Sequence, residues 1–68
     1  MNIYDWMCVN ADRIVEAVKT DGGKLDGPTA GPLLDEAFRQ YQPGRTRDKA
    51  RELLKIKLDK AGFKGLLS

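Results

Sequence analysis

The segment that decides the fold is Thr46–Gly62, which reads TRDKARELLKIKLDKAG. Thr46 is a favourable N-cap residue, and Gly62 suits the left-handed conformation that often follows a helix. Between them the apolar residues recur at helical spacing and fall in one stripe, made of Ala50, Leu53, Leu54, Leu58 and Ala61. The segment therefore predicts an amphipathic helix that must pack against other parts of the chain.

Charged side chains cover the rest of this predicted helix in three rows. The row furthest from the apolar stripe is acidic, with Asp48, Glu52 and Asp59. A basic row lies on either side of it, with Arg51 and Lys55 in one and Lys49 and Lys60 in the other. This pattern is typical of a solvated face with ion pairs of about 0.2–0.5 kcal/mol each, but it also fits an element that contacts phosphates.

A first helix is predicted from Ile3 to about Lys19, with Asn2 as its cap. Its apolar positions repeat at helical spacing: Ile3, Met7, Ala11, Ile14 and Val18. The apolar arc spans roughly 200°, more than the ~100° that one packing partner requires. We expect this helix to lie in a groove between the other two or to meet a second molecule. Asn10 interrupts the arc, so a break near Asn10 is an alternative.

The next segment, DGGKLDGPTAG at residues 21–31, ends the first helix and is rich in glycine. It lacks the spacing of a phosphate-binding P-loop, and the carboxylates of Asp21 and Asp26 would repel phosphate. We expect a simple loop with Leu25 in the core. A second helix then runs from near Thr29, its expected N-cap, to about Tyr41, with an apolar face of Leu33, Leu34, Ala37, Phe38 and Tyr41.

These patterns predict an all-α, compact three-helix domain that spans residues 1–68. A short turn with Pro43 and Gly44 joins the second and third helices, which is compatible with a helix-turn-helix-like pairing. The chain has one cysteine, Cys8, so an internal disulfide is impossible. A single thiol in a helical apolar pattern is more often a small buried residue, and the alternative is a disulfide-linked dimer through Cys8. The apolar residues of the last segment, FKGLLS, are expected to pack against the first helix.

The composition argues against an enzyme. The sequence contains no histidine, and its one serine is the last residue. Asp35 and Glu36 are adjacent, so their carboxylates do not point together on a helix. We therefore predict no catalytic residue, no cofactor and no metal site.

The N-terminal segment lacks the basic start of a secretory signal and no long apolar run follows, which favours a cytoplasmic protein without a membrane partner.

Charge is distributed unevenly along the chain. Residues 1–38 contain three basic and seven acidic residues, and residues 39–68 contain nine basic and three acidic ones. Such asymmetry favours an anionic partner, although the two halves can also attract each other. We place first a non-enzymatic DNA-binding regulatory protein that contacts phosphates near the start of the third helix, through Arg39, Arg45, Arg47, Lys49, Arg51 and Lys55.

The alternative is a small protein-interaction module. Tyr4, Trp6 and Met7 lie in the wide apolar arc of the first helix and are residue types that anchor interfaces, so a homodimer through this helix is also expected. By analogy of size and composition, such a module would be of the kind with which phages or mobile elements inhibit or redirect a larger host protein, such as transcription or defence machinery.

Overall fold

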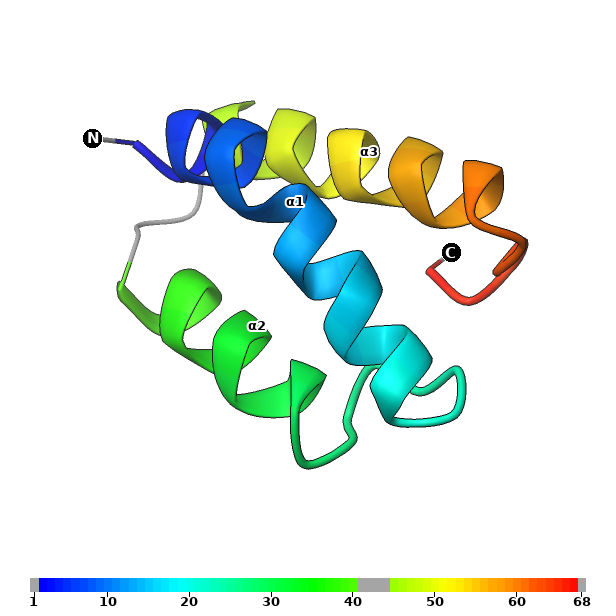
Figure 1. The fold of residues 1–68 in the computed structure, drawn as a ribbon. Helices are drawn as coiled ribbons and strands as arrows, with labels where there is room; N and C mark the ends of the chain where they lie inside the picture. The colour runs from blue at the N-terminus through cyan, green and yellow to red at the C-terminus, as the bar shows by residue number, and fades with distance from the viewer. Residues whose placement is uncertain (1, 41–44, 68) are drawn as a thin grey trace.

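The computed structural model describes residues 2–40 and 45–67, without the side chains of Gln40 and Arg45. These residues form three α-helices (Figure 1), named α1 (Ile3–Thr20), α2 (Ala30–Gln40) and α3 (Arg45–Lys60). The two described ranges contain no strand, so the predicted all-α three-helix class is confirmed. α1 packs against both α2 and α3, which explains the width of its apolar arc.

α1 is one continuous helix, and the break considered near Asn10 does not occur. The side-chain oxygen of Asn2 accepts a 2.8 Å hydrogen bond from the backbone N–H of Asp5, as expected of an N-cap. Asn10 donates its side-chain amide to the carbonyl of Trp6 at 2.9 Å and accepts from Arg13 at 3.0 Å. Because both ends of the Asn10 amide are bonded within the helix, it caps no second helix.

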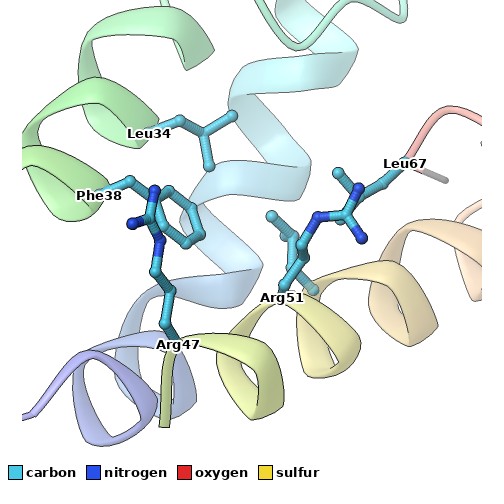
Figure 2. A pocket seen from close by; sticks show the side chains of 6 residues that line it. Leu34, Phe38, Arg47, Arg51 and Leu67 are labelled. Atoms are coloured by element: carbon cyan, nitrogen blue, oxygen red, sulfur yellow. The ribbon is translucent and has the colours of Figure 1, made fainter. Parts of the chain in front are cut away.

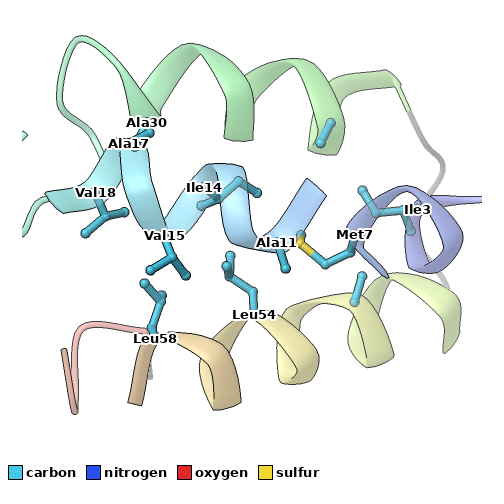
Figure 3. Packing of buried hydrophobic residues seen from close by; sticks show 12 residues of the cluster. Ile3, Met7, Ala11, Ile14, Val15, Ala17, Val18, Ala30, Leu54 and Leu58 are labelled. Atoms are coloured by element: carbon cyan, nitrogen blue, oxygen red, sulfur yellow. The ribbon is translucent and has the colours of Figure 1, made fainter. Parts of the chain in front are cut away.

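The core is formed where α1 crosses the other two helices (Figure 3). The five apolar residues predicted from the spacing of the first helix are all buried. From α3, the predicted stripe contributes Ala50, Leu54 and Leu58, each at most 1% exposed. α2 contributes Ala30 and Ala37 as fully buried residues and packs its larger side chains at the edge of the core. The helical spacing in the sequence therefore predicted the core correctly.

α1 and α3 end in the same way, with a glycine turn that returns backbone hydrogen bonds to the last carbonyls. At the end of α1 the N–H of Gly23 donates to the carbonyl of Val18 at 2.8 Å. At the end of α3 the N–H of Phe63 donates to Leu58 at 2.9 Å, and Gly62 has the expected positive φ of 96°. The Phe63 ring also lies against Gly23, so the two turns touch.

The start of α2 differs from the prediction. Thr29 was expected to supply the cap from its own side chain, but the capping oxygens come from Asp21, eight residues earlier. The Asp21 carboxylate accepts from the N–H of Thr29 at 3.0 and 3.1 Å and from that of Ala30 at 2.7 Å. Leu25, in the same loop, packs partly buried against the core, as expected.

The start of α3 also differs by one residue. The helix begins at Arg45, so Thr46 lies in its first turn and is not the N-cap. Tyr41 and the predicted Pro43-Gly44 turn lie outside the described residues. The helix-turn-helix-like pairing is not confirmed, because α2 and α3 each pack mainly on α1 and contact each other less. An opening between α2 and α3 follows from this arrangement.

Candidate functional site

The opening between α2 and α3 holds a cavity of about 300 Å³ (Figure 2). α2, α3 and the C-terminal segment each contribute side chains to it, and we call it the α2–α3 groove: Leu34, Phe38, Arg47, Arg51, Leu54 and Leu67. Leu54 is 1% exposed and forms part of the floor, where the groove meets the core. The groove is thus an apolar cavity with two arginines at its side.

Arg47 is held in the groove by Phe38. Its guanidinium carbon lies 5.2 Å from the centre of the Phe38 ring, which is a cation–π distance (Figure 2). Arg47 reaches the ring because its position on α3 is next to the buried stripe on the side facing α2. A guanidinium that stacks by its face keeps its N–H donors in its own plane, where they can bind an acceptor.

Arg51 lies one helical turn after Arg47 on the same side of α3, and its guanidinium lies beside Leu67 (Figure 2). Residues at this spacing have Cβ atoms about 5–6 Å apart, but the two guanidiniums point to different sides of the groove, that of Arg47 to Phe38 and that of Arg51 to Leu67 (Figure 2). Lys55 follows after a further turn and is partly buried. None of the six lining residues has an acidic or nucleophilic side chain. The groove is therefore suited to binding an apolar group next to an anion.

The structure does not gather all six residues predicted to bind nucleic acid. It brings together Arg47 and Arg51, but Arg39 lies on the exposed face of α2, in a shallow hollow shared with Asp35 and Glu36. The side chain of Arg45, also in the predicted set, lies outside the described residues. The carboxylates beside Arg39 reduce its attraction for phosphate.

Lys49 is separated from the two groove arginines. It lines a second shallow hollow, with Tyr4 of α1 and Glu52 of its own helix, on the side of α3 that faces the start of α1. Asp48 and Glu52 are exposed, as the predicted acidic row requires. The basic residues of α3 therefore form two surfaces on either side of an acidic one.

The three residues predicted to bind a protein partner differ in exposure. Tyr4 is 36% exposed, Trp6 packs partly buried against the core, and Met7 is 0% exposed. Met7 is thus part of the core and is not the surface anchor that was predicted. Cys8 is exposed, contrary to the expectation of burial. A side-chain hydrogen bond with Cys8 raises the pKa of Tyr4 above its usual value.

An ion pair between described residues, Lys57 and Asp12, links the basic and acidic halves of the chain. The Lys57 amine extends outward from the edge of the apolar stripe and lies 3.5 Å from a carboxylate oxygen of Asp12 in α1. Both side chains are well exposed, at 43% and 85%, so the pair contributes at most about 1 kcal/mol. Attraction between the halves inside the domain is therefore present but small at this pair.

The apolar wall of the groove was missed from the sequence. Phe38 and Leu34 were assigned to the face of α2 that packs on the core, and Leu67 to a tail packed on the first helix. In the structure they do pack against the core, partly buried, and they also line the cavity, which the sequence did not predict. The spacing of Arg47 and Arg51 was a usable signal, but the angle between α2 and α3 was not encoded in any local pattern.

Comparison with protein-family models, with curated proteins and with solved structures finds no match to this chain. Within the part of the chain that the structure describes, no helix combines the length and the hydropathy that crossing a membrane requires. The functional argument therefore depends on the α2–α3 groove itself.

Proposed function

We propose that this protein is a non-enzymatic protein-binding module. Its α2–α3 groove holds a large apolar side chain of a partner, and Arg47 binds a carboxylate next to this side chain. The observation that carries the proposal is the placement of the Arg47 guanidinium, over the Phe38 ring, at the side of an apolar cavity of about 300 Å³. Each half of this combination has a physical role in recognition.

The apolar half supplies affinity. A leucine or phenylalanine side chain that leaves water for such a cavity contributes about 1.5–3 kcal/mol. Leu34, Phe38, Leu54 and Leu67 provide the surface that receives it. A volume of 300 Å³ is at the lower limit of ligand pockets, so it suits one or two side chains of a partner.

The cationic half supplies specificity. A planar guanidinium can donate two parallel hydrogen bonds to a carboxylate. The Phe38 ring orients the Arg47 guanidinium before a partner binds. Less side-chain entropy is therefore lost when a partner arrives.

DNA binding was the interpretation placed first from the sequence, and the geometry favours it less. A phosphate backbone gains from an open cationic surface, but it gains nothing from an apolar cavity. Arg39 and Lys49 lie away from the groove, each next to carboxylates. The two proposals differ in their ligand, so one set of titrations separates them.

The test is calorimetric titration with three acidic helical peptides that differ at few positions. The first has one leucine flanked by glutamates, the second has alanine in place of the leucine, and the third has lysines in place of the glutamates. We expect the first to bind and the second to lose about tenfold in affinity, since truncating leucine removes more than 1.4 kcal/mol of burial. The third is expected not to bind.

Variants identify the site. Arg47→Glu is expected to abolish binding of the first peptide, whereas Lys60→Glu, the same charge change at an exposed position of α3, is expected to leave it intact. Equal loss in both variants would mean non-specific charge attraction and would refute the proposal. Binding of generic duplex DNA without peptide binding, with a salt slope of about −0.9 per phosphate contact, would return the DNA interpretation to first place.

A further inference from the structure

A second surface of the protein lies between α1 and α3, away from the groove. It is a hollow of about 380 Å³, and we call it the α1–α3 hollow: Tyr4 of α1 with Lys49, Glu52, Leu53 and Ile56 of α3. Ile56 is 44% exposed and Tyr4 is 36% exposed, so two of the three large apolar residues that are exposed in the described part of the chain meet here. Apolar side chains that gather in a hollow and remain in contact with water indicate a surface that a partner can cover.

The same hollow contains one charge of each sign. Lys49 and Glu52 are both exposed, and they lie three residues apart on the face of α3 that also bears Ile56. Neither of the two forms an ion pair with another residue of the described ranges. Both charges are therefore available to groups outside the chain.

We propose that the α1–α3 hollow is the contact surface of a homodimer with two-fold symmetry. A two-fold contact joins the same patch of both copies, so that a residue which meets a second residue across the contact is met by it in return. A patch with one lysine and one glutamate is complementary to itself under this symmetry, because Lys49 of each copy approaches Glu52 of the other. Leu53 and Ile56 of the two copies then cover each other.

The surrounding charges do not oppose this contact. Lys57, next to Ile56, is already paired with Asp12. The other exposed charges that adjoin the lining residues, along the chain or one turn away, are two of each sign: Asp5, Asp48, Arg51 and Lys60. A surface of mixed sign has no strong field that would repel its own copy.

The expected dimer is weak, because the hollow is lined by few residues. We expect a dissociation constant of roughly 100 µM, as for a contact below the standard interface size. At the low micromolar concentrations of an unfolding titration the protein is then monomeric. Substitutions in the hollow therefore act on association and leave the stability of the single domain nearly unchanged.

The contact leaves the α2–α3 groove open. None of the described residues that line the groove also lines the hollow. The inference thus goes beyond the proposed function, and either can fail without the other. A dimer presents two grooves at once, which increases its avidity for a partner that carries two binding segments.

The test is sedimentation velocity between about 10 µM and about 1 mM, a range that brackets the expected dissociation constant. A reducing buffer keeps the exposed Cys8 from linking two copies by a disulfide. Wild-type protein is expected to shift from monomer to dimer over this range. Ile56→Lys is expected to remain monomeric. Val9→Lys makes the same kind of change at a position that is 70% exposed and outside the hollow, so it is the matched control and should dimerise like wild type.

A charge exchange tests the two ion pairs. Lys49→Glu and Glu52→Lys each place like charges opposite each other in the symmetric contact, so each variant alone is expected to stay monomeric. An equimolar mixture of the two is expected to form a heterodimer, since both charge pairs are restored. The double variant with both changes is expected to dimerise by itself. Circular dichroism checks that each variant is folded.

A wild type that is monomeric at every concentration, or single charge variants that dimerise like wild type, would overturn the inference. A mixture that stays monomeric, or a monomeric Val9→Lys, would do the same, because the contact would not depend on the hollow. Ile56→Lys is expected to bind the acidic leucine peptide like wild type. A protein that dimerises but does not bind this peptide would refute the proposed function alone, so the two failures are distinguishable.

Discussion

The carboxylate of Asp21, the residue that follows α1, accepts a 2.7 Å hydrogen bond from the backbone N–H of Ala30, the first residue of α2. The same carboxylate accepts from the N–H of Thr29, and the N–H of Asp21 itself donates to Ala17 in α1. One residue therefore ends one helix and begins the next. It fixes where α2 starts relative to α1, and so it helps to set the opening in which the groove lies.

The charge of Asp21 gives a pH-dependent prediction. Burial alone would raise the pKa of Asp21, but hydrogen bonds from Ala30 and Thr29 outweigh it and lower the pKa below its ordinary value of 3.8. A carboxyl group whose pKa is lower in the folded protein stabilises the fold above its unfolded pKa, and this stabilisation is lost as the pH falls through the folded pKa.

We therefore expect the thermal midpoint of wild type to fall more steeply between about pH 5 and pH 2 than that of Asp21→Asn. Asp26→Asn, which changes an exposed carboxylate in the same loop, is the control and should follow the wild-type profile. Parallel profiles for wild type and Asp21→Asn, measured by circular dichroism, would show that the Asp21 charge is not what stabilises the start of α2.

Position 27 is predicted to accept only glycine, because the Asp21 side chain occupies the space that a Cβ atom would need. A Cβ atom at Gly27 would lie 2.5 Å from Cβ, Cγ and Oδ2 of Asp21, which forces a displacement. Gly27→Ala should cost about 1–3 kcal/mol in the free energy of unfolding, measured by urea denaturation. The cost should be smaller in an Asp21→Gly background, where the colliding atoms are absent. An equal cost in both backgrounds would place the strain elsewhere.

The orientation of α3 predicts different effects of alanine substitution at Leu54 and Ile56, two residues of similar size. Leu54 is 1% exposed and Ile56, two residues later, is 44% exposed. Leu54→Ala is expected to cost about 2–5 kcal/mol, a large share of the stability of so small a domain, and urea denaturation should show a much lower midpoint. Ile56→Ala is expected to change the midpoint little. Similar losses at both positions would contradict the orientation of α3.

The contact between Arg47 and Phe38 predicts a coupling energy. A double-mutant cycle with Arg47→Ala and Phe38→Leu should give about 0.5–1 kcal/mol, since the leucine keeps an apolar side chain but removes the ring that faces the guanidinium. The cycle is measured by urea denaturation at fixed salt. The control cycle pairs Phe38→Leu with Lys60→Ala and should give no coupling. A value near zero for the first pair would mean that the ring does not orient Arg47.

Much of this fold was predictable from local patterns, because the positions of Met7, Ile14, Leu54 and Leu58 repeat at helical spacing and all four are buried. The cap of α2 was not predictable from local patterns. Asp21 accepts hydrogen bonds from backbone groups eight and nine residues later, and no local rule specifies a contact over that distance in sequence. The groove was predictable in part.

The spacing of Arg47 and Arg51 indicated a shared site, but the apolar wall opposite them depends on how α2 is inclined to α3.

The most direct test of the central claim is a methyl NMR titration of the protein with the acidic leucine peptide. The account predicts chemical-shift changes at the methyl groups of Leu34, Leu54 and Leu67, which line the groove, and their loss in Arg47→Glu. Ile56, which lies outside the groove, should not shift. Changes confined to Ile56 and its neighbours, or shifts that persist in Arg47→Glu, would contradict the claim that the α2–α3 groove is the binding site.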